Sequence, residues 1–283
     1  METKHPAVAV PPGAPTSRSE TRAVRRRHRP EHHYRLVSAA SVAMAVLVWF
    51  ILTNTVARNA DGFPSPQLLA LTFLDLVYHG YTGKPLWAHV LTSLSETLGG
   101  FTLAVAVGVP VGLVVGYYRM ARAIAMPFID FMRPIPPISL VTIFVFYFGI
   151  GFGSKVALIF LTGFWFMILA TTEGVRSLPK DYYRAAKSMG MRPGQIFRMV
   201  VLPGALPSIL TGMRTTLSIS WALVVAAELI ASQVGLGYMI TDASNFYKLP
   251  IVYVVVLIIA TFGFIMDRTV VAINHRVLHW QGK

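Results

Sequence analysis

The sequence predicts an all-α, polytopic membrane protein with about six transmembrane helices. Of its 283 residues, 54% are hydrophobic and 13% are charged, whereas soluble globular proteins carry about 25% charged residues. Several apolar runs approach the length of about 20 residues that a helix needs to cross a bilayer. The chain contains no cysteine, which excludes disulfide-stapled domains, thiolate catalysis and cysteine-bound metal centres.

Residues 1–35 are predicted to be a disordered, basic cytoplasmic tail, followed by a transmembrane domain over residues 36–283. The tail is rich in Pro, Ala, Ser and Arg and has no apolar periodicity, which is typical of disorder. Its basic run at residues 25–29 can attract anionic membrane lipids. The simpler explanation is that this run only keeps the N-terminus inside the cell.

Five apolar runs are predicted to be transmembrane helices, because each reaches or approaches the required length. They occupy residues 36–56, 98–118, 156–172, 207–231 and 249–266. A sixth run at residues 135–151 is shorter and begins with two prolines, so we expect an irregular or re-entrant start followed by a helix. Irregular backbone at membrane depth must lie inside protein or along water. This segment is therefore expected inside the helix bundle.

The predicted external segments carry local structure of their own. Apolar residues at helical spacing predict an interfacial helix over residues 66–78, and residues 89–97 are expected to begin the next helix. In that helix, Gly112 and Gly116 form a small-residue face that lets helices approach closely. The last external loop, residues 232–248, is expected to turn tightly and to place Leu236 inward.

The distribution of basic residues predicts the orientation of the chain. With the N-terminus in the cytoplasm, the inside segments hold 21 Lys and Arg and the outside segments hold four, which are Arg58, Lys84, Lys155 and Lys248. This positive-inside asymmetry predicts that both termini are cytoplasmic. The net charge of +13 is therefore mainly a topology signal. No nucleic-acid partner is expected, because no basic patch is interleaved with aromatic residues in a recognisable module.

Residues 173–206, between the fourth and fifth predicted spans, are the most informative cytoplasmic segment. Four residues at helical spacing predict one apolar face of a short helix, and they are Tyr182, Ala185, Ala186 and Met189. Basic residues lie on the other face. Gly190 is placed to end this helix in a left-handed conformation.

A second short helix is predicted to follow this corner. Pro193 can open it, and Leu202-Pro203 is expected to stop it. Two short helices that meet at a glycine form a rigid knob, which can pass a push from a soluble partner into the bundle. The alternative is an ordinary interfacial loop that lies on lipid headgroups.

The spacing of this segment resembles the EAA loop of ABC-type importer permeases. The pattern of that loop is EAA, three residues, Gly, nine residues and I-x-L-P, and it fits Ala185-Ala186, Gly190 and Leu202-Pro203 with Val200 in the apolar position. Arg184 stands where the family usually has Glu. Short motifs elsewhere resemble the nitrate, sulfonate, taurine and bicarbonate branch of these permeases, and they are Arg133-Pro134-Ile135-Pro136-Pro137, Phe148-Gly149-Ile150-Gly151, Glu228-Leu229 and Gly235-Leu236-Gly237.

The resemblance implies the fold and the partners of a type I ABC importer permease in the bacterial inner membrane. Two permease chains, here a homodimer, would enclose a pathway. Two ATP-binding cassette subunits would bind ATP and Mg²⁺ and receive the loop as a coupling helix. A periplasmic or lipid-anchored solute-binding protein would deliver a small anion. The residues expected to contact the ATPase are Tyr182, Arg184, Ala185, Ala186, Met189, Gly190, Met191 and Pro193.

Three residues of the fifth predicted span are candidates for the substrate pathway, namely Ser218, Trp221 and Glu228. An intramembrane carboxylate is costly and usually faces a partner or water, so Glu228 can line or gate the pathway. The alternative is a structural hydrogen bond from Glu228 to Ser, Thr or Trp on a neighbouring helix, and Trp221 can equally be packing. Arg133 can attract an anion, although a positive-inside anchor explains it as well.

The sequence shows no sign of an enzyme or of a resident cofactor. Its eight histidines form no metal-ligand pattern, and no catalytic constellation is recognisable. The chain has no GxxxxGK[ST] loop and so has no phosphate-binding loop for a nucleotide. The alternative function is a secondary transporter or channel without an ATPase. That function predicts several intramembrane charges or an inverted repeat, whereas the predicted spans show one acidic residue, Glu228, and no convincing repeat.

Overall fold

The computed structural model describes residue 37, residues 40–41, residue 44 and residues 47–51, followed by residues 64–278. The chain divides into two units, Met1–Leu52 and Thr53–Lys283. In the first unit the described residues are helical. The predicted tail and part of the first predicted span lie outside the described residues.

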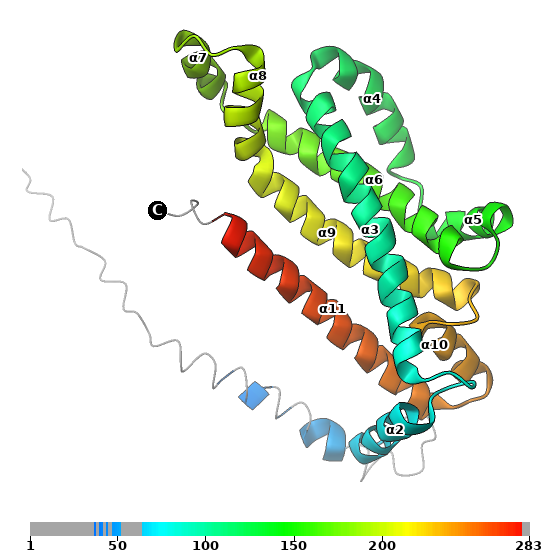
Figure 1. The fold of residues 1–283 in the computed structure, drawn as a ribbon. Coiled ribbons are helices and arrows are strands. Elements are labelled where there is room, and N and C mark those ends of the chain that lie inside the picture. The colour runs from blue at the N-terminus through cyan, green and yellow to red at the C-terminus, as the bar shows by residue number, and fades with distance from the viewer. Residues whose placement is uncertain (1–36, 38–39, 42–43, 45–46, 52–63, 279–283) are drawn as a thin grey trace, which may run out of the picture. The chain divides into compact units, whose positions relative to one another are not determined.

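The second unit is a helix bundle, and its described residues contain no β-strand. Figure 1 shows the elements in place. In chain order they are α2 (Pro66–His79), α3 (Leu86–Tyr117), α4 (Arg119–Met132), the 3₁₀ turn η2 (Pro137–Leu140), α5 (Val141–Phe148), α6 (Phe152–Arg176), α7 (Lys180–Ser188), α8 (Pro193–Ile196), the π-helical turn η3 (Phe197–Val201), α9 (Leu202–Ile230), α10 (Leu236–Asn245) and α11 (Leu249–Val277).

Four helices of the described residues are long and apolar enough to cross a membrane, and they confirm four predicted spans. They are α3, α6, the continuous helix from α8 to α9, and α11. Helix α3 begins at Leu86, well before the apolar run at residue 98, so residues 89–97 do begin this helix as predicted. The first turns of α3 did not count as part of an apolar run, because they contain the polar residues His89, Ser93 and Glu96. All three are buried.

Helices α3, α6 and α9 pack against one another at the centre of the unit. A Cβ on Gly112 would lie 2.6 Å from the Cβ of Thr171, and a Cβ on Gly116 would lie 2.7 Å from the Cβ of Val175. Only glycine permits this distance between α3 and α6. The small-residue face predicted from the sequence is therefore confirmed, and its partner is α6.

The short apolar run at residues 135–151 forms part of a bent pair rather than a straight span. Helix α4 and the η2–α5 segment meet at 85°, and the irregular start at Pro137 is confirmed as a 3₁₀ turn. Helix α5 packs on α6, but Phe146 is 82% exposed and Tyr147 is also exposed. The expectation that this segment lies inside the bundle is wrong for the single chain, because α5 buries only one side.

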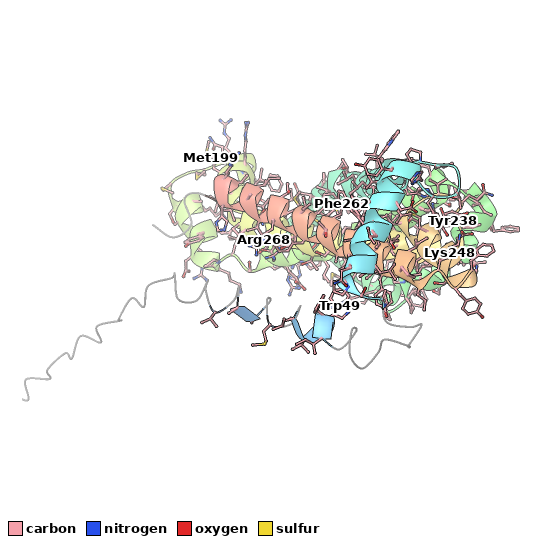
Figure 2. The ribbon with its side chains drawn as sticks, turned by 90° about the horizontal axis from the view of Figure 1, so that it is seen from below. Trp49, Met199, Tyr238, Lys248, Phe262 and Arg268 are labelled. Carbon is pink, nitrogen blue, oxygen red and sulfur yellow. The ribbon has the colours of Figure 1, made fainter. Side chains whose placement is uncertain are left out.

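The segments that were predicted to be external gather at one end of the unit, with α2 and α10 (Figure 1). Figure 2 shows Tyr238 and Lys248 at this end and Met199 of η3 at the other. The helix predicted over residues 66–78 is confirmed as α2. Leu236 is fully buried as predicted, but the predicted loop at residues 232–248 contains the helix α10.

The Tyr81 hydroxyl donates to Asp242 at 2.7 Å, and burial together with this carboxylate raises the pKa of Tyr81.

Candidate coupling site and transport pathway

The predicted coupling knob is the segment from α7 to η3, residues 180–201, at the end of the unit opposite α10 (Figure 1). Gly190 follows α7 with φ +75°, the left-handed conformation that the sequence predicts. The Met191 N–H donates to the Ala186 carbonyl at 3.2 Å across this corner. Pro193 is the first residue of α8, as predicted. The knob thus has a defined corner between two short helices.

The prediction that Leu202-Pro203 stops the second helix is wrong. The helix runs from α8 through η3 directly into α9. Pro203 lies in the first turn of α9, where a missing N–H is tolerated, and the Leu202 N–H donates to the Phe197 carbonyl across the π turn. The knob is therefore continuous with a transmembrane helix, so a displacement of the knob acts on α9 without an intervening loop.

The predicted coupling face divides into exposed and buried residues. Tyr182, Ala185 and Met189 are exposed, Met189 by 73%. Ala186 is only 1% exposed, so the prediction that it belongs to an open docking face is wrong in this chain. Arg184 is exposed and lies 3.4 Å from Asp181 on the surface of α7. The exposed face of α7 therefore has a small side chain at Ala185 and larger ones at Tyr182 and Met189.

The buried side of the knob joins the core of the bundle. Ala186, Ile196 and Val201 belong to one apolar cluster that continues into α3, α6 and α9. The rings of Phe197 and Tyr117 lie 5.3 Å apart in an edge-on contact that links η3 to α3. The knob is therefore packed into the close-packed core of the bundle, and such interiors deform little.

The three predicted pathway residues separate into two places. Ser218 and Trp221 line a cavity of about 210 Å³ between α9 and α11, together with Arg214 and Asp267. The Trp221 Nε1–H donates to the Ile259 carbonyl of α11 at 3.1 Å, which makes Trp221 part of the α9–α11 contact. The Arg214 guanidinium binds Asp267 through two hydrogen bonds of 2.6 and 2.8 Å.

Glu228 lies away from that cavity and is hydrogen-bonded on both oxygens. Its Oε1 accepts from the Ser93 hydroxyl of α3 at 2.6 Å, and its Oε2 accepts from the Gly237 N–H at 2.7 Å. The Leu236 N–H donates to the Ser93 hydroxyl at 3.0 Å. The sequence analysis left open that Glu228 makes a structural hydrogen bond to a serine, and the bond from Ser93 is of this kind. Together these bonds hold the start of α10 against α3 and α9.

A buried ion pair beside Glu228 was missed by the sequence analysis. Lys155 of α6 is 4% exposed, and its Nζ lies 2.8 Å from Glu96 Oε1 and 2.8 Å from the Ser232 hydroxyl. Sequence analysis counted Lys155 as an external charge and began the second span after Glu96. The signal that would have found the pair is the helical spacing of His89, Ser93 and Glu96, which puts three polar groups on one face.

A polar cavity of about 500 Å³ lies where α6 and α9 meet the end of α4. Hydroxyl groups make up much of its lining, and they belong to Ser177, Ser208, Thr211, Thr215 and Thr216. Arg133 and Glu173 also line it, yet no ion pair joins them among the described residues. The Thr216 hydroxyl is buried without a hydrogen-bond partner.

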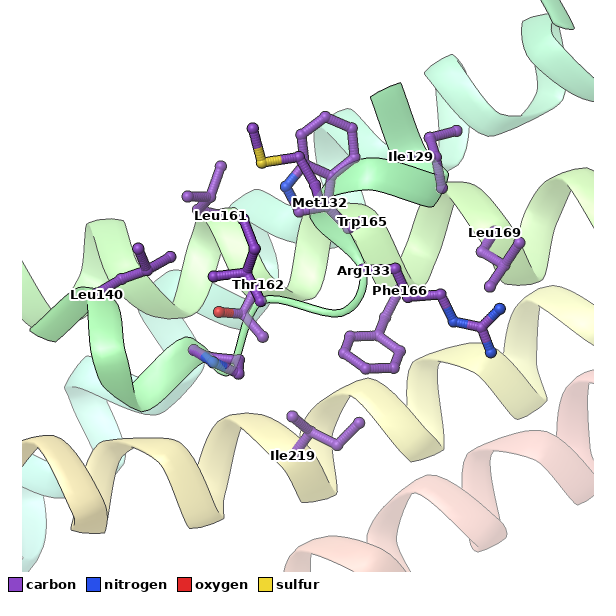
Figure 3. Close-up of a pocket in the computed structure, with 12 residues that line it drawn as sticks. Ile129, Met132, Arg133, Leu140, Leu161, Thr162, Trp165, Phe166, Leu169 and Ile219 are labelled. Carbon is purple, nitrogen blue, oxygen red and sulfur yellow. The ribbon is translucent and has the colours of Figure 1, made fainter. Parts of the chain in front are cut away.

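An apolar chamber of about 280 Å³ adjoins this cavity beneath the α4–η2 bend. Arg133, Phe166 and Leu169 line both spaces. Figure 3 shows the Arg133 side chain extending from the bend past Phe166 toward Leu169, with Trp165 and Leu161 on the other side of the chamber. The two spaces therefore adjoin at Arg133, Phe166 and Leu169.

The described residues hold no group of three His, Asp or Glu side chains that could bind a metal ion. What the arrangement offers is mechanical and electrostatic. It has an exposed knob face, a helix that links this face to the bundle, and polar cavities along that same helix.

Comparison with known proteins identifies the family. A family model described as "Binding-protein-dependent transport system inner membrane component" matches residues 108–279. A probable ABC transporter permease of Brucella abortus (strain 2308) is 36% identical over 241 residues, covering 85% of this chain and 94% of its relative. The taurine transport system permease protein TauC of Escherichia coli (strain K12) is 34% identical over 248 residues, with 87% and 90% covered. The bicarbonate transport system permease protein CmpB of Synechococcus elongatus is 32% identical over 251 residues, with 86% and 89% covered.

A solved structure confirms the fold. The inward-facing methionine ABC transporter MetNI matches with a TM-score of 0.61 at 20% identity, covering 68% of this chain and 97% of that chain. The fold is that of a type I ABC importer permease. Members of this family are transport subunits rather than enzymes, and a separate subunit hydrolyses ATP. With an exposed knob joined to a transmembrane bundle, the chain belongs to the family of binding-protein-dependent transport system inner membrane components, the permease subunits of ABC importers.

Proposed function

We propose that this chain forms the pathway through which an ATP-driven importer moves a small anion of the taurine, sulfonate, nitrate or bicarbonate type into the cytoplasm. The observation that carries the proposal is the coupling knob. Its exposed face at Ala185 is open to a partner, its buried face is part of the core, and its second helix continues into α9. ATP and Mg²⁺ bind to the partner ATPase in this proposal, not to this chain.

The transport pathway forms between two copies of the chain in this proposal. Arg214 and Asp267 carry charge on two transmembrane helices and remain partly exposed, at 49% and 29% of their side chains. Charged groups at such depth face water or protein rather than lipid. The exposed aromatic side of α5 likewise has no cover within the described chain. In a homodimer, Arg214 and Asp267 can face a water-filled interface between the two chains. The second chain can also cover the exposed aromatic side of α5.

An anionic cargo fits the relatives and one feature of the site. Two relatives are named for taurine and bicarbonate transport. In this chain Arg133 lines both spaces beneath α4 and has no ion-pair partner among the described residues. A periplasmic or lipid-anchored solute-binding protein delivers the anion at the α2–α10 end. In this proposal both termini are cytoplasmic.

The test is co-purification of the ATPase with variants of α7. Ala185→Trp puts a large ring on the exposed face and is expected to abolish ATPase binding while the chain still inserts into the membrane. Lys187→Trp, on another exposed side of α7, is the matched control and should keep the ATPase. Arg184→Glu should also keep it, because an exposed charge contributes little.

Two results would contradict this proposal. Loss of the ATPase with Lys187→Trp or Arg184→Glu, but not with Ala185→Trp, would place the docking surface on another side of α7. Uptake that continues without ATP and follows an ion gradient would instead support a secondary transporter or channel.

A further inference from the structure

The chamber and the polar cavity beneath α4 share three lining residues, Arg133, Phe166 and Leu169. The chamber is lined almost entirely by apolar and aromatic side chains of α4, η2, α6 and α9. The cavity is the more polar of the two, because hydroxyl-bearing residues and two charged residues join apolar ones in its lining. Ligand sites in proteins are commonly apolar spaces of about 300–1,000 Å³ with a few placed polar groups. The two spaces together have this character.

We propose that they form one binding site for a small organic anion, whose apolar body occupies the chamber and whose anionic group binds the Arg133 guanidinium. This inference rests on the proposed function and names the class of solute that passes through the site. It assigns to the permease a selectivity of its own, separate from that of a solute-binding protein.

The position of Arg133 determines where the anionic group lies. Arg133 lines both spaces, whereas Glu173 lines only the polar cavity. An anion is attracted by the guanidinium and repelled by the carboxylate, so its body is directed into the chamber. A guanidinium offers a planar set of donors that matches a sulfonate or carboxylate.

The volume and lining of the chamber determine the body of the ligand. Its volume is about 280 Å³, and an apolar protein cavity of about 150 Å³ already holds benzene. Trp165 and Phe166 supply aromatic walls. Inorganic anions such as bicarbonate or sulfate have no apolar surface to bury in the chamber. They therefore lack the favourable binding free energy that grows with buried apolar area.

The test measures binding to the full-length chain in phosphatidylcholine nanodiscs. The probe is 4-nitrobenzenesulfonate, a nitroaromatic that quenches tryptophan fluorescence on contact. Quenching is expected in the native chain and should largely disappear in Trp165→Phe, because Trp165 lines the chamber. Benzenesulfonate should compete with the probe, and inorganic sulfate should not.

Matched variants separate the charge from the chamber. Arg133→Gln is expected to weaken binding by roughly tenfold or more. Arg119 is exposed like Arg133 but lines neither space, so Arg119→Gln should change binding less than about twofold. Glu173→Gln should tighten binding, since it removes a repelling charge. Leu161→Phe fills the chamber and should weaken binding, whereas Leu103→Phe on an exposed side of α3 should not.

Three outcomes would overturn the inference. They are equal competition by sulfate and benzenesulfonate, unchanged binding in Arg133→Gln, and loss of the quench in phosphatidylglycerol nanodiscs, which would identify a lipid as the occupant. A failure of the proposed function is distinguishable from these, because it appears as an absent ATPase in co-purification, a measurement that uses no probe.

Discussion

Glu228 shows at the residue scale why a carboxylate is kept inside this bundle. Both of its oxygens are used within the chain, by Ser93 of α3 and by the N–H of Gly237 at the start of α10. A Cβ on Gly237 would lie only 2.5 Å from the Val225 carbonyl oxygen, so the backbone of α10 approaches α9 as closely as glycine allows. The carboxylate therefore holds α10 in place.

This arrangement predicts a stability effect for Glu228. Glu228→Leu leaves the Gly237 N–H without its acceptor, which is expected to lower the free energy of unfolding by roughly 1–3 kcal/mol. The Ser93 hydroxyl can still donate to the His89 carbonyl, 3.3 Å away. Glu228→Gln keeps one acceptor and should cost less. Unfolding of the purified chain in detergent measures both. Lost transport with unchanged stability in Glu228→Gln would instead assign the carboxylate to the pathway.

The Lys155–Glu96 pair predicts a non-additive result. Lys155→Met leaves the buried Glu96 without its cation, which is expected to cost about 3–5 kcal/mol of folding stability. The double variant Glu96→Leu with Lys155→Met removes both charges and should be more stable than Lys155→Met alone. A double-mutant cycle on unfolding measures the difference. Additive losses would show that the two charges do not depend on each other.

At the element scale, the helices of the knob were predictable from local signals and their burial was not. A glycine after an amphipathic run gave the corner at Gly190, and a proline gave the start of α8. The continuation through Leu202-Pro203 was missed, because a π turn that accommodates Pro203 has no sequence signal of its own. The burial of Ala186 was missed for a related reason, since spacing defines a face but not its partner.

Gly190 gives a prediction that belongs to the element. At φ +75° a side chain is strained, although a Cβ would meet no atom within 4 Å. Gly190→Val is therefore expected to cost roughly 1–2 kcal/mol through backbone strain alone and to misdirect α8, so that ATP hydrolysis no longer drives uptake. Gly190→Asn, which tolerates this conformation, should be milder.

The chain offers a matched control for that corner. A Cβ on Gly194 also meets no atom within 4 Å, and Gly194 has no positive φ. Gly194→Ala should therefore leave the coupling of hydrolysis to uptake unchanged. Equal loss of coupling in Gly194→Ala and Gly190→Val would show that added bulk, not backbone conformation, is responsible.

At the scale of the whole molecule, apolar length predicted the number and order of the spans in the described residues, and packing decided the rest. Lys155 was assigned outside, but α3 extends far enough to bury it with Glu96. The segment at residues 135–151 was expected inside the helix bundle, but in the single chain one side of α5 remains exposed. Both errors have the same origin, because hydropathy describes a single helix while burial depends on its neighbours.

The orientation of the molecule gives the last prediction. The knob lies at one end of the bundle, and α2 and α10 lie at the other (Figure 1), separated by α3, whose 32 residues span about 48 Å as a helix. The positive charge of the knob and of the terminal segments predicts that the knob end lies in the cytoplasm. A reporter active only outside the cytoplasm should therefore work when fused at Lys84 or Asn245, and it should be silent at Lys187 or after Lys283. A reporter active only in the cytoplasm, fused at the same four positions, should give the opposite pattern and show that every fusion is expressed. External activity at Lys187 would put the knob on the wrong side of the membrane for an ATPase and would refute the coupling mechanism.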